Sequence, residues 1–168
     1  MLEPYFVTFA GHREVSHFRE IELMLDSVVR ELLKTKEFVE FYVGLDGDFD
    51  ALAVSAIRRA RRAYGNQNSA INLVLPYRKA DMTSYEAQFD TVMIAETAQG
   101  VHPKKAITVR NRCMIDNSNM LICFIERQTG GAAATFKYAK SKPDIIIKNL
   151  FDELWMVDKE YDDENIMS

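Results

Sequence analysis

The chain has 168 residues, of which 48% are hydrophobic and 27% are charged, and its formal net charge is −4 at pH 7. This length suits one domain with a buried core, and no apolar run approaches the roughly 20 residues that a membrane-spanning helix needs. The negative charge argues against a nucleic-acid partner, although it leaves room for a local basic patch.

The N-terminal sequence "MLEPYFVTFAGHRE" predicts a strand and not an export signal. It has no basic region before its apolar stretch and no small-residue cleavage site after it, so we expect a cytoplasmic protein. Cys113 and Cys123 are then expected to be free thiols. The three histidines lack partner carboxylates or cysteines at ligand spacing, and no metal site is expected.

Strand-like and helix-like segments alternate through the first half of the chain. Residues 5–10, "YFVTFA", are β-branched and aromatic and predict a strand, and apolar residues at helical spacing predict a helix over 20–34. The segment 38–44, "FVEFYVG", predicts a second strand and 50–64 a second helix. The run 71–77, "INLVLPY", predicts a third strand that ends near its proline.

The pattern weakens over residues 78–103, where "TVMIAE" is a candidate short strand without an assignable place in a sheet. Residues 104–119 predict a helix, 120–126 ("MLICFIE") an apolar strand, and 144–149 ("DIIIKN") a last strand, with an alanine-rich helix between these two strands. Apolar strands separated by helices are typical of a parallel α/β sheet with helices on both faces.

The predicted domain covers residues 1–150, and residues 151–168 are expected to form a helical or frayed acidic tail. Trp155 in "DELWMVD" is expected to pack a C-terminal helix on the domain or on another subunit. The sequence therefore leaves a homo-oligomer open.

In a doubly wound sheet, ligands bind beyond the carboxyl ends of the strands, where the winding reverses. In "FAGHRE", Gly11 follows the first strand, and His12 and Arg13 are expected to project into a ligand site, a reading favoured over a purely structural turn. In "VGLDGDFDA", Gly44 permits a tight turn, and Asp50 is interpreted either as a ligand contact or as a helix cap.

The loop "TGGAAAT" offers a candidate anion site. Gly130 and Gly131 would bring backbone amides to a helix N-terminus, an arrangement that favours a phosphate, with a plain tight turn as the alternative. Arg110 and Asn111 lie in the helix before this loop, and a guanidinium near a phosphate gives a charge-assisted contact.

The segments "TFAGHRE", "FYVGLDGDFDALA", "LVLPY", "RNRCMIDNSNMLICFIE" and "TGGAAATFKYAK" together resemble the SLOG superfamily, closest to its YpsA-like branch of bacterial proteins, from Val7 to Ile147. The resemblance implies a single-domain Rossmann-like fold that binds a nucleotide or a nucleotide-derived ligand. The positions that match are Gly11, Arg13, Asp50, Arg110, Asn111, Gly130, Gly131 and Thr135.

LOG-type enzymes of the same superfamily release a base from a nucleoside monophosphate, and their signature resembles "PGGxGTxxE". Here Thr129 replaces the proline, and Tyr138 stands three residues after Thr135, where that signature has its glutamate. A carboxylate usually stabilises the charge that develops when an N-glycosidic bond breaks, so its absence weakens the case for this chemistry. Asp50 or Asp116 is left as a substitute.

The leading interpretation is a domain that binds a nucleotide-like small molecule at the carboxyl edge of the sheet, as a sensor or a sequestering protein. Two alternatives stay open, a hydrolase that cleaves an N-glycosidic bond and a protein-interaction module with a vestigial cleft. Whether the chain is an enzyme is not decided by the sequence.

Overall fold

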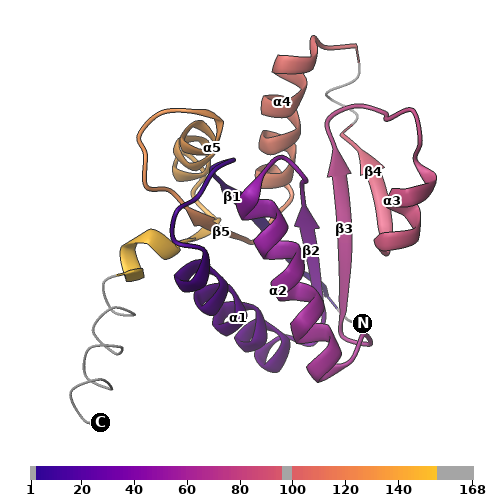
Figure 1. The fold of residues 1–168 in the computed structure, drawn as a ribbon, viewed down its shortest axis with the longest axis vertical. Helices are drawn as coiled ribbons and strands as arrows, with labels where there is room; N and C mark the ends of the chain where they lie inside the picture. Colours follow the sequence, from indigo (N-terminus) through magenta and orange to yellow (C-terminus); the bar gives the residue numbers. More distant parts are fainter. Residues whose placement is uncertain (1–2, 96–99, 155–168) are drawn as a thin grey trace.

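The computed structural model describes residues 3–95 and 100–154. They form one parallel sheet between two layers of helices (Figure 1). In chain order the elements are β1 (Tyr5–Gly11), α1 (Phe18–Thr35), β2 (Val39–Val43), α2 (Asp48–Tyr64), β3 (Ser69–Leu75), α3 (Thr83–Gln88), β4 (Thr91–Ile94), α4 (Pro103–Asp116), β5 (Met120–Phe124), α5 (Gly131–Lys140), β6 (Ile146–Asn149) and the 3-10 helix η2 (Leu150–Glu153).

The sheet has the strand order β4-β3-β2-β1-β5-β6, and all neighbouring strands run parallel. The chain winds outward from β1 to β4, returns through α4 to the other side of β1, and continues outward to β6. The winding therefore reverses between β1 and β5, where Gly11 is paired with Phe124. This is the position at which open α/β sheets bind their ligands.

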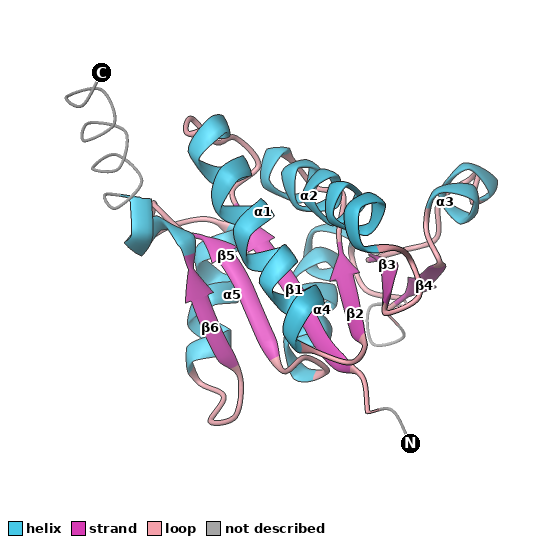
Figure 2. Cartoon of the chain, turned by 90° about the horizontal axis from the view of Figure 1, so that it is seen from below, coloured by secondary structure: helices cyan, strands magenta, loops and turns pink. Residues whose placement is uncertain are grey.

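The helices α1 and α2 cover one face of the sheet, and α4 and α5 cover the other (Figure 2). In α1 the buried side is apolar at helical spacing, as Ile21, Leu25 and Val28 illustrate. Burying one such side chain contributes roughly 1.5–3 kcal/mol. The apolar stripe read from the sequence is thus the surface that fixes α1 on the sheet.

Strand β5 is apolar throughout because both of its faces are buried. All five of its residues are buried, with Ile122 and Phe124 in the core under α1 and α2 and Leu121 and Cys123 in the core under α5. Cys123 is a buried free thiol, and burial raises its pKa to about 12. A strand buried on both faces loses the polar alternation that a half-exposed strand shows.

The predicted α/β fold with helices on both faces is confirmed, with element ends that shift by one to three residues. The segment "TVMIAE" contributes β4, which pairs with β3 at the edge of the sheet. The short helix α3 was not predicted. Trp155 and most of the predicted tail lie outside the described residues. In the described part of the chain, no helix is both long and apolar enough to span a bilayer.

Candidate functional site

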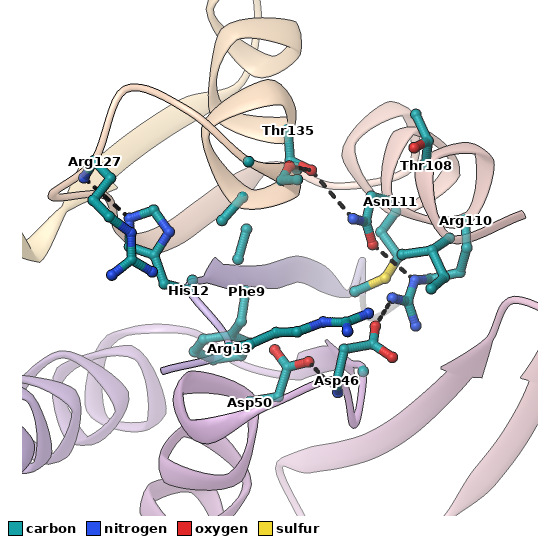
Figure 3. Close-up of a pocket in the computed structure, with 18 of the residues that line it drawn as sticks. Phe9, His12, Arg13, Asp46, Asp50, Thr108, Arg110, Asn111, Arg127 and Thr135 are labelled. Carbon is teal, nitrogen blue, oxygen red and sulfur yellow. Dashed lines mark hydrogen bonds and ion pairs between the residues drawn. The ribbon is translucent and has the colours of Figure 1, made fainter. Parts of the chain in front are cut away.

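A cavity of about 530 Å³ opens at the carboxyl edge of the sheet, at the reversal point between β1 and β5 (Figure 3). Its walls come from the loops after β1, β2 and β5 and from α4. The structure brings all ten sequence-predicted ligand residues to this cavity, and their role in binding stays a prediction. They are Gly11, His12, Arg13, Gly44, Asp50, Arg110, Asn111, Gly130, Gly131 and Thr135.

Backbone contacts fasten the loops after β1 and β2 to one another. The amide of Asp48 donates to the carbonyl of Arg13 at 2.8 Å, and the amide of Val15 donates to the Asp48 carboxylate at 3.1 Å. A Cβ on Gly47 would lie 2.4 Å from the Cα of Arg13, so this approach requires glycine. The two loops therefore form one continuous wall of the cavity.

Gly11 and Gly44 are also sites of close packing. A Cβ on Gly11 would lie 2.1 Å from Cγ of Phe49, which closes the core directly beneath the cavity. A Cβ on Gly44 would lie 3.0 Å from both Nη1 of Arg110 and Oδ2 of Asp50. The absence of side chains at Gly11 and Gly44 thus allows Phe49 to pack against β1 and allows the Arg110 and Asp50 side chains to lie close to the backbone at the cavity floor.

The two glycines before α5, Gly130 and Gly131, have different structural roles. Gly130 has φ +96°, a conformation that residues with a side chain rarely adopt, and a Cβ on Gly131 would meet nothing within 4 Å. Gly130 therefore makes the turn, and Gly131 borders open space on the cavity side. The turn is the structural reason for Gly130, and the approach of a ligand to Gly131 stays a prediction.

The N-terminus of α5 faces this open space with bare backbone. Its N-cap is Gly130, which has no side chain to cap the helix, and Gly131 and Ala132 line the cavity. The first amides of an α-helix have no intrahelical carbonyl to bind, and the helix dipole places partial positive charge there. This wall is suited to an anion.

Arg110 lies under the cavity with a side chain that is only 2% exposed. Its Nε donates to Oδ1 of Asn111 at 2.8 Å, and its Nη1 donates to the carbonyl of Val74 at 2.9 Å. Its Nη2 forms an ion pair with the carboxylate of Asp46. Arg110 is therefore engaged on three sides, and it joins α4 to β3 and to the loop after β2.

Asn111 continues this network toward α5. Its Nδ2 donates to Oγ1 of Thr135 at 3.2 Å, and the Thr135 hydroxyl donates to the carbonyl of Gly131 at 2.9 Å. Thr135 is 7% exposed. Asn111 and Thr135 thus set the position of the α5 N-terminus relative to Arg110, which makes both of them positioning residues.

His12 is 6% exposed and holds the loop after β5. Its Nε2 accepts hydrogen bonds from the amides of Glu126 and Arg127, both at 3.2 Å. Burial lowers the pKa of His12, the Arg127 charge lowers it further, and the Glu126 charge opposes the shift. A neutral imidazole whose Nε2 is occupied in this way positions the loop that leads to Gly130.

Two carboxylates stand at the floor of the cavity. Oδ2 of Asp50 accepts a hydrogen bond from the amide of Asp46 at 2.9 Å. Burial raises the pKa of Asp50 to about 6; the Asp46 charge adds to this shift, and the Asp46 amide and Arg110 oppose it. Asp50 therefore changes charge near neutral pH.

Asp116, the other carboxylate considered for catalysis, does not line the cavity. It lies in the last turn of α4, where it accepts a hydrogen bond from the Tyr138 hydroxyl at 2.7 Å and forms an ion pair with Lys142 at 3.1 Å. Helices of this fold begin at the carboxyl edge of the sheet and end at the opposite edge. Asp50 is thus the one of the two that can meet a ligand in the cavity.

The cavity is cationic although the whole chain is acidic. Four basic side chains line it, those of Arg13, Lys104, Arg110 and Arg127, against the carboxylates of Asp46 and Asp50. Figure 3 shows the Arg13 side chain extending along the floor between Asp50 and Arg110. Within the described residues, the Arg13 guanidinium has no hydrogen-bond or ion-pair partner. Its charge is available to a ligand.

Sequence reasoning missed Asp46, Lys104, Thr108 and Arg127, which also line the cavity. Asp46 and Arg127 lie in the loops that follow strands β2 and β5, so their place in the chain was a usable signal. Lys104 and Thr108 lie in the first turns of α4, beyond a segment whose pattern was weak. Among the described residues, no group of three or more His, Cys, Asp or Glu side chains could hold a metal ion.

No known family profile matches the sequence, and no curated protein matches it. The solved structures that are similar in fold include the following three. DNA processing protein A (DprA) from Streptococcus pneumoniae has a TM-score of 0.59 at 16% identity, with 82% of this chain and 47% of that chain covered. DprA from Helicobacter pylori, described for its single-stranded DNA binding mode, has a TM-score of 0.53 at 16% identity, with 82% and 61% covered. The molybdenum cofactor carrier protein from Chlamydomonas reinhardtii has a TM-score of 0.54 at 14% identity, with 86% and 76% covered.

At these identities the similarity shows the fold alone. This chain spans about half the length of the S. pneumoniae DprA chain and 61% of the H. pylori one. The neighbours share the Rossmann-like α/β fold that the sequence predicts.

Proposed function

We propose that the cavity binds a nucleotide or a nucleotide-derived small molecule and that the protein acts as a sensor or a sequestering domain of the YpsA-like kind. One observation carries the proposal. A single cavity at the reversal point of the sheet has a wall of backbone amides and basic side chains opposite a floor with two carboxylates.

The α5 wall is suited to the phosphate. Amides at Gly131 and Ala132 can donate to phosphate oxygens, and the exposed side chains of Arg13 and Arg127 add positive charge beside them. A hydrogen bond to a charged group contributes about 1.5–3 kcal/mol. Two or three such bonds contribute about 3–9 kcal/mol, and the cost of association offsets much of this, so tight binding requires further contacts at the floor.

The floor is suited to the rest of a nucleotide. The carboxylates of Asp46 and Asp50 can accept hydrogen bonds from ribose hydroxyls or from an amino group. A simple anion would use only the α5 wall and would be repelled by the floor, whereas a nucleotide can use both. The volume of about 530 Å³ is also within the usual range for a small-molecule site.

A second candidate is hydrolysis of an N-glycosidic bond, favoured by the pKa of about 6 of Asp50 at the cavity floor. A carboxyl group with this pKa can exchange a proton at neutral pH, as general acid–base catalysis requires. The position of the glutamate in the LOG-type signature is held by Tyr138, which bonds Asp116 outside the cavity. Release of free base from a nucleoside monophosphate, lost in Asp50→Asn, would establish this reaction.

Thermal unfolding in the presence of small molecules tests the proposal. We expect AMP, ADP-ribose or NAD to raise the melting temperature, and adenosine and inorganic phosphate to raise it far less, because each of these two occupies only half of the cavity. A ligand at 100 times its Kd adds about 2.7 kcal/mol of apparent stability. A flat response to every nucleotide would favour the protein-interaction alternative instead.

The expectation that nucleic acid is not a partner gains no support from the comparisons. One of the similar structures, DprA from H. pylori, is described as binding single-stranded DNA. A nucleotide within a longer strand and a free nucleotide share the base, the sugar ring and a phosphate group, which is a diester in the strand and a monoester in AMP. Oligonucleotides therefore belong among the ligands to be measured.

A further inference from the structure

The charges of the chain are distributed unevenly between the two faces of the sheet. Between Pro103 and Asn149, the sequence contains nine Lys or Arg residues and three Asp or Glu residues, although the whole chain has a net charge of −4. Within α4 and α5 the only acidic residue is Asp116. The helical layer formed by α4 and α5 has six Lys or Arg residues against this one Asp, whereas the layer formed by α1 and α2 has seven Lys or Arg residues against six Asp or Glu residues.

On α4, two exposed basic residues and a threonine form a stripe. Lys105, Thr108 and Arg112 are separated by three and four positions, so they share one face of the helix, and all three are exposed. The stripe is about 10 Å long, the rise of about three stacked nucleotides. Thr108 and the neighbouring Lys104 also line the cavity, so the stripe adjoins it.

The stripe continues onto α5 through an aromatic residue. The Arg112 guanidinium lies 5.0 Å from the ring centroid of Tyr138, and Lys142 Nζ lies 4.6 Å from the same centroid. Lys137 and Lys140 are exposed on α5 itself. We call this surface, made of Lys105, Arg112, Lys137, Tyr138, Lys140 and Lys142, the basic α4–α5 surface.

We propose that the basic α4–α5 surface binds single-stranded nucleic acid. Phosphates of an extended strand can contact the lysines and Arg112, and a base can stack on the exposed side of the guanidinium that already packs on Tyr138. A surface of lysines alone would bind any polyanion. Here Arg112 and Lys142 lie against the Tyr138 ring, and this pairing of cationic and aromatic groups favours a partner that has both phosphates and bases. The layer formed by α1 and α2, in which basic and acidic residues nearly balance, has no comparable excess of positive charge.

The test compares two double variants with the same change in net charge. Lys105→Glu/Lys137→Glu alters the basic α4–α5 surface, and Arg30→Glu/Arg62→Glu alters the α1–α2 layer. All four residues are exposed, and none of their side chains makes a hydrogen bond or an ion pair within the described residues. None of them lines the cavity, so the affinity for a small ligand can be measured on both variants independently of the affinity for a strand.

Fluorescence anisotropy with a labelled oligothymidylate in about 50 mM salt gives the affinity. We expect the parent to bind and Lys105→Glu/Lys137→Glu to bind at least about tenfold more weakly, with Arg30→Glu/Arg62→Glu changed by less than about threefold. The slope of log K against log salt should also decrease by about 1.4 in the first variant, for two lost phosphate contacts.

Several outcomes would overturn this assignment. Equal weakening in both variants would mean that only net charge matters, and tighter binding of a duplex of the same length would argue against stacking. Binding of the parent to phosphatidylserine vesicles without binding to the oligonucleotide would make the surface a membrane contact. Failure of nucleotide binding in the cavity with intact oligonucleotide binding would overturn the proposed function alone.

Discussion

The carboxylate of Asp46 is paired with Nη2 of Arg110, across 64 positions of the chain, at the floor of the cavity. Arg110 is almost fully buried, whereas the Asp46 side chain is 31% exposed and borders the open space. The pair joins α4 to the loop after β2. Arg110 therefore has a structural role as well as any role in binding.

The variant Arg110→Ala should lose stability as well as affinity. It leaves the carbonyl of Val74 and the carboxylate of Asp46 without their donor, at a cost on the order of 2–3 kcal/mol, less than for a fully buried pair because Asp46 is partly exposed. Urea unfolding measures this loss. The matched control is Arg62→Ala on the surface of α2, and an Arg110→Ala variant as stable as this control would contradict the structural role.

Arg13→Ala should separate binding from stability. The guanidinium of Arg13 has no partner among the described residues, so its removal should leave the unfolding free energy unchanged. Affinity for a nucleotide should decrease by about 1.5–3 kcal/mol, the range for a hydrogen bond to a charged group. Calorimetric titration with AMP measures the affinity, and undiminished binding would mean that Arg13 does not contact the ligand.

The two glycines before α5 should respond in opposite ways. Gly130→Ala forces a side chain into a backbone with φ +96° and should cost about 1–3 kcal/mol of stability. The Cβ of Gly131→Val would meet no heavy atom within 4 Å outside the adjoining backbone, so stability should change little, while the branched side chain fills the approach of the phosphate. Melting temperature and AMP affinity are measured on both variants. Parent-like affinity in Gly131→Val would place the phosphate elsewhere.

Asp50→Asn should alter how stability depends on pH. The pKa of Asp50 in the folded protein is about 6, higher than the ordinary value of 3.8. The protonated carboxyl therefore contributes its full share of folding stability below pH 3.8, and this share is lost as the pH rises through 6. The amide in Asp50→Asn stays neutral. Relative to the parent, the variant should gain about 2–3 kcal/mol between pH 4 and pH 7.5. Urea unfolding across this pH range measures the difference in unfolding free energy between variant and parent. A difference that does not change with pH would contradict the burial of a charged Asp50.

The sequence was informative where the signal is local. The apolar run of β5 and the helical spacing in α1 specify buried elements by themselves, and a parallel sheet then places the loops containing Gly11, Gly44 and Gly130 at one edge. The division of tasks between Gly130 and Gly131 needs backbone angles that no residue pattern gives. The Asp46–Arg110 pair is also beyond local reading, because residues far apart in sequence meet only after the layers pack.

The most direct measurement of the central claim is a titration of the ¹⁵N-labelled protein with AMP, followed by two-dimensional NMR. Phosphate binding at the α5 N-terminus predicts that the amide signals of Gly131 and Ala132 shift most, together with those of the loop that contains Asp46, and that adenosine alone leaves the α5 signals in place. Shifts confined to other parts of the molecule, or none at millimolar AMP, would contradict a nucleotide site in this cavity.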